Sequence, residues 1–157
     1  MNFIIILCVI ISMLPLLELR VGLPFAISYA VKNNIPIFPV SLLIILSNIL
    51  VIFFVFYFLD NLNKRCMKNK VYTKIFNFYL RKMQNKIDKF EKKYSILGFI
   101  GLLIFVSVPL PGTGAWSGVF ISWILDLDRK KSILSIAGGV LIAGVLILLT
   151  TLGFFYY

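Results

Sequence analysis

Two charged residues, Glu18 and Arg20, interrupt the apolar N-terminal part of the chain, within the segment ELRVGLP at 18–24. A charge at the centre of a bilayer costs about 2.5–3.5 kcal/mol or more, so such residues usually pair or face water. One interpretation is a mutually neutralising pair near a membrane interface. The other is a substrate or proton site, which the broken apolar pattern favours because an interrupted helix opens a polar cavity.

Gly22 and Pro24 follow the two charges and predict how the chain turns there. Glycine permits a tight turn, and proline suits the first turn of a helix, where its missing N–H is not needed. We therefore expect a short helix to begin near Pro24. Its free N–H groups and positive dipole end would face Glu18 and Arg20.

A second break, PLPGTGAW at 109–116, carries no charge. Two prolines would end one helix, two glycines would let the chain reverse, and Thr113 would cap a helix starting near Gly114. A helix N-terminus is a natural seat for a phosphate, although a plain helix-breaking loop explains the same letters. The candidate substrate-binding residues of this break are Pro111, Gly112, Thr113, Gly114 and Trp116.

Together the two segments predict one pocket. Arg20 would hold a phosphate with its fork of donors, and Glu18 would either orient Arg20 or exchange a proton and couple transport to a proton gradient. Asn48, near the middle of a long apolar run, could line the same path or pack against another helix.

The composition limits what else the chain can do. Of 157 residues, 61% are hydrophobic and 14% charged, against about 45–50% and 25% in soluble domains, so we expect a helical integral membrane protein. Histidine is absent, and the six acidic residues and two cysteines show no metal-ligand spacing. We therefore expect no metal, no cofactor and no enzymatic activity.

The apolar runs divide the chain into five parts of one membrane domain. Residues 1–34 and 95–125 each hold two runs too short to cross a bilayer, whereas 35–59 and 133–157 are uncharged runs of 25 residues, long enough to span with some tilt. We expect each short pair to form a re-entrant hairpin that enters and leaves on one side. Four to six ordinary helices with poor ends are the alternative.

The remaining part, 60–94, is strongly basic, with eleven Lys or Arg against three acids over residues 60–93. Its apolar residues recur every three or four positions, which predicts an amphipathic helix on anionic lipid headgroups rather than on nucleic acid. With hairpins, fourteen basic residues share one face, so 60–94 and 126–132 are expected in the cytoplasm of a plasma-membrane protein, with both termini outside.

The same hydropathy pattern occurs twice. Shifted by 94 positions, residues 15–59 align with 109–153 without a gap, and Pro15 meets Pro109. With hairpins, the halves are inverted relative to each other, an arrangement that marks many transporters. The predicted fold is therefore all-α, with two inverted repeats, each a re-entrant hairpin plus a transmembrane helix, joined by the basic helix.

The segments at 18–24 and 109–118 resemble the small multidrug export protein family over most of the chain. That family is similar in outline to the DedA superfamily, whose members have two opposed re-entrant hairpins and include polyprenyl-phosphate and phospholipid translocases. The resemblance implies that Glu18, Arg20 and the turn at 112–114 line the pocket. The Arg that the DedA pattern has in the second hairpin is missing from this chain.

Three functions follow as hypotheses. The first is a transporter of a lipid phosphate or another amphipathic anion, and the second is an exporter of cationic amphipathic drugs with Glu18 as counter-charge. The third is a structural or assembly protein that acts through its basic helix. Membrane lipids are the expected partners, and a homodimer is compatible with so small a transporter.

Overall fold

The computed structural model describes residues 3–15, 17–66, 98–110 and 112–156, and in these it is all-helical, as predicted. Five labelled helices follow in order: α1 (Phe3–Met13), α2 (Glu18–Lys32), α3 (Ile37–Cys66), α5 (Ala115–Ile124) and α6 (Arg129–Tyr156). A further apolar helix, Gly98–Ser107, precedes α5. Pro111 and most of the predicted basic helix at 60–94 lie outside the described residues.

Two helices are long and apolar enough to cross a membrane, Ile37–Leu62 within α3 and Arg129–Phe154 within α6. Each has 26 residues, which is about 39 Å of helix against a hydrocarbon core of about 30 Å. At most half of the most apolar stretch of each helix is buried inside the chain. The remaining side chains, such as Leu46, Leu50 and Phe53, point outward as an apolar surface suited to lipid.

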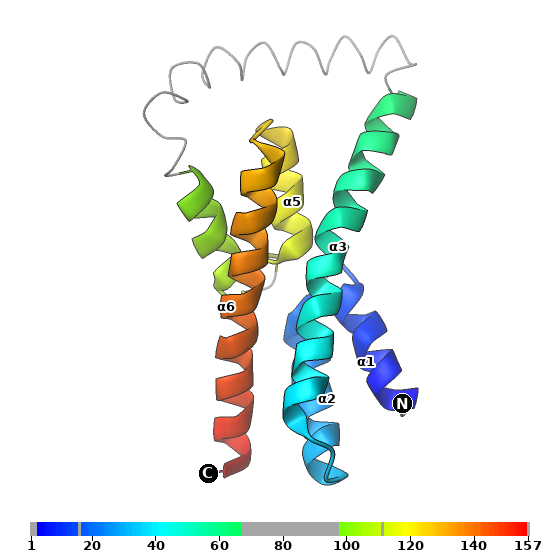
Figure 1. Cartoon of the computed structure of the whole chain (residues 1–157), viewed down its shortest axis with the longest axis vertical. Helices are drawn as coiled ribbons and strands as arrows, with labels where there is room; N and C mark the ends of the chain where they lie inside the picture. Colours follow the sequence, from blue (N-terminus) through cyan, green and yellow to red (C-terminus); the bar gives the residue numbers. More distant parts are fainter. Residues whose placement is uncertain (1–2, 16, 67–97, 111, 157) are drawn as a thin grey trace.

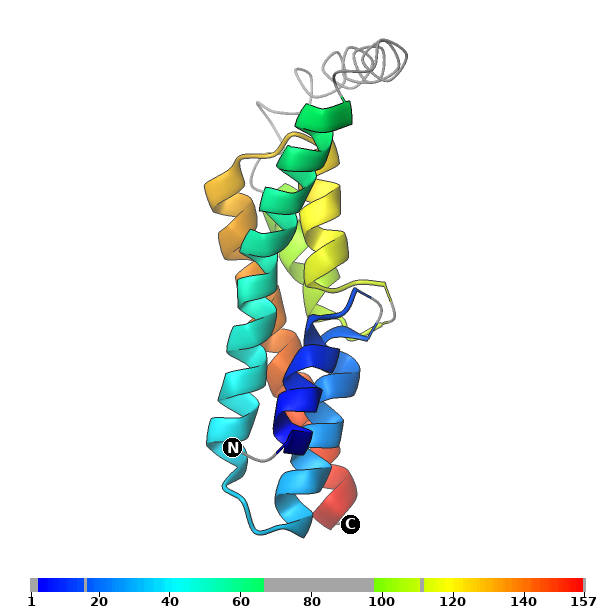
Figure 2. The ribbon, with the colours of Figure 1, turned by 90° about the vertical axis from the view of Figure 1, so that its right-hand side faces the viewer.

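The short helices lie in pairs beside the two long ones (Figure 1). α1 and α2 run in opposite directions and are joined by residues 14–17; these residues and the start of α2 as far as Arg20 are here called the first turn. The Gly98–Ser107 helix and α5 are joined in the same way by residues 108–114, the second turn. The two turns approach each other about half-way along the long helices (Figure 2). The termini lie toward one end of the molecule, and the end of α3 and the start of α6 lie toward the other (Figure 1).

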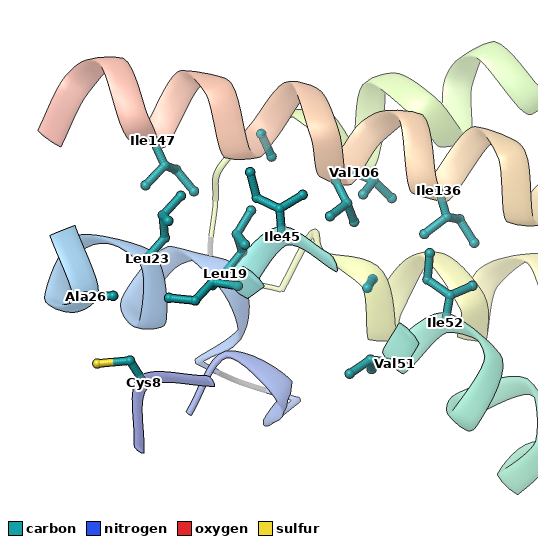
Figure 3. Close-up of a cluster of buried hydrophobic side chains, with 14 of the residues drawn as sticks. Cys8, Leu19, Leu23, Ala26, Ile45, Val51, Ile52, Val106, Ile136 and Ile147 are labelled. Carbon is teal, nitrogen blue, oxygen red and sulfur yellow. The ribbon is translucent and has the colours of Figure 1, made fainter. Parts of the chain in front are cut away.

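A cluster of buried aliphatic side chains holds the helices together (Figure 3). Leu23 and Ile27 of α2, Ile44 and Ile52 of α3 and Ile136 of α6 are all fully buried. Because these residues come from both sequence halves, the halves share one core. That core continues past both turns and fixes how they face each other.

Glycines let three helix pairs approach closely. A methyl group on Gly139 of α6 would lie 2.7 Å from the Val106 Cβ, and one on Gly144 would lie 2.8 Å from the Ile45 side chain. On α2, a methyl group on Gly22 would lie 2.7 Å from the Ser12 Cβ and 2.8 Å from the Cys8 carbonyl oxygen. Close backbone approach through small residues is how membrane helices associate.

The expected start of the second helix was wrong. α2 begins at Glu18, and Pro24 lies inside it. Gly22 is therefore not a turn residue but a contact with α1. An apolar helix tolerates an internal proline where neighbours satisfy the freed backbone groups. At its other end, α3 continues seven residues beyond the predicted boundary at 59, to Cys66.

We predict that Gly22→Ala lowers the thermal stability of the detergent-solubilised protein. The added methyl group meets the Cys8 backbone, which cannot move aside as a side-chain end could, and overpacking of this kind costs about 1–3 kcal/mol. Gly153→Ala on α6 is the matched control, since its methyl group has nothing within 4 Å. Equal melting temperatures for the two variants would contradict the close α1–α2 contact.

Candidate functional site

The first turn supplies a carboxylate to the start of α5. The Trp116 backbone N–H donates to Glu18 Oε1 at 3.2 Å. α5 has Gly114 as its N-cap and no cap from that residue's own side chain, so the Glu18 carboxylate takes the position that a Ser or Asp cap usually fills. The Glu18 residue is only 4% exposed.

Gly114 makes room for this carboxylate. A methyl group on Gly114 would lie 1.3 Å from Glu18 Oε2, a full overlap. The Gly114 backbone itself is extended, with φ −110° and ψ −155°, so any residue could adopt it. Glycine is therefore needed for space and not for conformation.

Arg20 bridges to the second turn. Its Nη2 donates to Thr113 Oγ1 at 2.7 Å and, more weakly, to the Val108 carbonyl oxygen at 3.4 Å. No carboxylate lies within 4 Å of its guanidinium among the described side chains, where the one ion pair joins Asp60 and Arg129. Arg20 is partly exposed. Glu18 and Arg20 are thus each hydrogen-bonded to the opposite turn, with no ion pair within 4 Å between them.

The second turn and α3 complete the end of α1. The Trp116 indole Nε1 donates to the Met13 carbonyl oxygen at 3.0 Å, and Asn48 Nδ2 donates to the Ser12 carbonyl oxygen at 2.7 Å. The last carbonyl groups of a helix have no partner within the helix. In an apolar environment each unsatisfied group would cost several kcal/mol, so these two side chains stabilise the break.

Glu18 also has an unusual backbone. Its φ is +46°, in the left-handed region, which non-glycine residues adopt at a cost of order 1 kcal/mol or more. In the second turn the left-handed residue is Gly112, with φ +88°. A glycine at 18 would relieve the strain but would remove the carboxylate. The strained backbone is therefore the cost of placing a carboxylate at this position.

The structure brings together most of the predicted pocket residues. Glu18, Arg20, Thr113, Gly114 and Trp116 share the contact between the turns. Gly112 lies on the same turn, Asn48 is buried beneath α1, and Gly22 and Pro24 lie further along α2.

The predicted cap by Thr113 was wrong. Its hydroxyl lies 2.6 Å from the Val108 carbonyl oxygen and 2.9 Å from that of Leu110. Thr113 therefore closes its own turn and accepts a hydrogen bond from Arg20, while Glu18 caps α5. No local sequence feature indicates a cap that comes from a residue 98 positions away.

A second polar cluster, which the sequence analysis missed, lies where α3, α5 and α6 meet. Asp60 accepts from Trp123 Nε1 at 3.1 Å and pairs with Arg129 at 2.6 Å. The Arg129 guanidinium lies 4.8 Å from the Phe56 ring centre, within cation–π range. Both charged side chains are about a third exposed or more. This cluster therefore joins α3, α5 and α6 at the surface of one end of the bundle.

Comparison with known protein families decides the identity. Residues 18–146 match the family described as "Putative small multi-drug export protein". The chain belongs to this family. No curated protein and no solved structure matches it. The match begins at Glu18 and includes Arg20, Thr113 and Trp116. Membership makes this a membrane protein of an export family rather than an enzyme family.

We predict a strong coupling between Gly114 and Glu18. Gly114→Ala should destabilise the wild-type protein, because its methyl group overlaps the Glu18 carboxylate. In a Glu18→Ala background the same change should cost much less, with a coupling free energy of about 1 kcal/mol or more. The four melting temperatures of this cycle measure it. Additive effects would show that the carboxylate does not rest against Gly114.

Proposed function

We propose that this small multidrug export family member is a transporter that moves an amphipathic anion, such as a lipid phosphate, through a site formed by the two turns. The observation that carries this proposal is the state of Arg20. Its guanidinium is partly exposed and bonded only to neutral oxygens of the described residues, Thr113 Oγ1 and the Val108 carbonyl. A phosphate offers that guanidinium a charged, bidentate partner.

The lengths of the short helices support a re-entrant arrangement. α1 has 11 residues, α2 has 15 and α5 has 10, which correspond to about 16, 22 and 15 Å of helix. None reaches the roughly 30 Å of a hydrocarbon core. In the proposed arrangement both turns lie inside the membrane, at the depth where transporters with broken helices bind their substrates.

Recurring backbone features support an inverted repeat. Glu18 and Gly112, which are 94 positions apart, are the left-handed residues of the two turns, and Asn34 and Asp126 are left-handed residues just after α2 and α5. α3 and α6 run in opposite directions (Figure 1). In the proposed topology, the face bearing the start of α6 and its basic residues is cytoplasmic.

The proposed topology predicts a labelling pattern for single cysteines in a cysteine-free background. Asn34→Cys and Asp126→Cys should react with a membrane-impermeant maleimide from opposite faces of oriented vesicles. From the face that labels Asp126→Cys, Leu14→Cys in the first turn should react more slowly than Asp126→Cys. Equal labelling of these two from one face would mean that α1 and α2 cross the membrane completely.

For the transport function, we predict that Arg20→Gln reduces the flux of a fluorescent lipid phosphate across proteoliposomes by at least about tenfold. The variant loses the charge-assisted bonds that bind the phosphate, each worth about 1.5–3 kcal/mol. Lys32→Gln, which removes one charge from the same helix, is the control and should keep the wild-type flux. An Arg20→Gln variant with unchanged flux would refute the anion proposal.

A second candidate is the export of cationic amphipathic compounds. It is favoured by the family description and by Glu18 Oε2, which accepts no hydrogen bond from the described residues. In this case Glu18→Gln should abolish efflux of a lipophilic cation while Arg20→Gln preserves it. The reverse dependence supports the anion transporter, and transport that tolerates both changes favours the structural role.

A further inference from the structure

We infer that Glu18 occupies the seat of the substrate's anionic group, the backbone of Gly114 and Trp116 at the start of α5, and that the substrate takes its place on binding. This inference rests on the proposed anion transport and specifies its site. Glu18 would then be a specificity residue, because only a group able to compete with a carboxylate for these backbone atoms gains entry.

The seat already holds an anion. Glu18 Oε1 accepts from the Trp116 N–H, and Oε2 lies where a Cβ of residue 114 would be. The carboxylate is thus in contact with the backbone and is removed from water, since the residue is 4% exposed. A phosphate or carboxylate of a ligand carries the same oxygens and would find the same donor and the same space.

A nearby cap was available but is not used. Thr113 adjoins the N-cap residue, yet its hydroxyl faces the Val108 and Leu110 carbonyls. The cap comes instead from the opposite half of the chain, on a residue with a strained backbone at φ +46°. A permanent cap would be more stable if it were local and unstrained, whereas a cap on a separate element can leave without unfolding α5.

Arg20 lies close enough to the start of α5 to bind the same anion. It lies two residues beyond Glu18 and bonds to Thr113, next to the N-cap Gly114. A phosphate at the start of α5 would therefore lie within the same small region as the guanidinium, and its several oxygens could serve both. Glu18 Oε1 reaches Trp116, while the guanidinium remains with neutral partners.

The test is calorimetric titration of the detergent-solubilised protein with dodecyl phosphate. Glu18→Ala should bind about fivefold more tightly than wild type, since a competing cap is worth about 1 kcal/mol. Glu18→Gln, which keeps a neutral oxygen in the seat, should tighten binding by a smaller factor. Equal tightening by Ala and Gln would mean that the charge acts at a distance and would overturn the inference.

Two further arms, the Arg20→Gln variant and inorganic phosphate as ligand, separate the remaining outcomes. Unchanged or weaker binding by both Glu18 variants overturns the exchange, and if Glu18→Ala does not fold, Glu18→Gln alone decides. Arg20→Gln binding as tightly as wild type would overturn the proposed function itself. Inorganic phosphate identifies the source of the anion: binding of dodecyl phosphate alone supports a lipid headgroup, and equal binding of both supports free phosphate.

Discussion

The structure depends on how four helix ends that lie in the middle of the bundle satisfy their backbone groups. α1 ends and α5 begins in mid-bundle, and each end leaves N–H or C=O groups without partners. Each of the two turns supplies hydrogen-bond partners to the other. Trp116 donates its indole N–H to the Met13 carbonyl at the end of α1, and its backbone N–H donates to the Glu18 carboxylate, which caps α5. One residue of α5 thus holds both ends of the first turn.

Packing around the turns follows from this contact. The polar groups can meet only if the helices behind them come close, and glycines on α2 and α6 allow that approach. Asn48 reaches the Ser12 carbonyl from α3 because the shared aliphatic core fixes α3 against α1. A methyl group added at Gly22 or Gly114 would therefore disturb the contact between the turns as well as the packing of the core.

Much of the architecture could be predicted from the sequence because long apolar runs and charged interruptions have few solutions. The two long helices followed from hydropathy. The pairing of Glu18 and Arg20 with the turn at 112–114 followed from the free-energy cost of placing charges in an apolar segment. The start of α2 did not, because Pro24 looks like a helix start. It is instead an internal residue whose missing N–H leaves the Arg20 carbonyl without its usual donor.

The cap of α5 was equally hidden, since local sequence suggested Thr113. A tertiary contact prevailed because Thr113 is engaged with its own turn and with Arg20. Such contacts join residues far apart in sequence, and neither periodicity nor turn chemistry carries information about them. The left-handed backbone of Glu18 is likewise a feature that only the folded chain shows.

The charges of the site limit how a transporter of this design can move. Glu18 and Arg20 are each hydrogen-bonded to the opposite turn. In the proposed re-entrant arrangement, separating the empty turns would remove these partners from both charges inside the membrane. Each such charge costs about 2.5–3.5 kcal/mol or more. A bound anion changes the balance at Arg20, because it can accompany the guanidinium as a paired counter-charge when the turns separate. In the proposed transporter, opening is therefore cheaper with substrate than without it, which is the condition for moving a substrate rather than leaking.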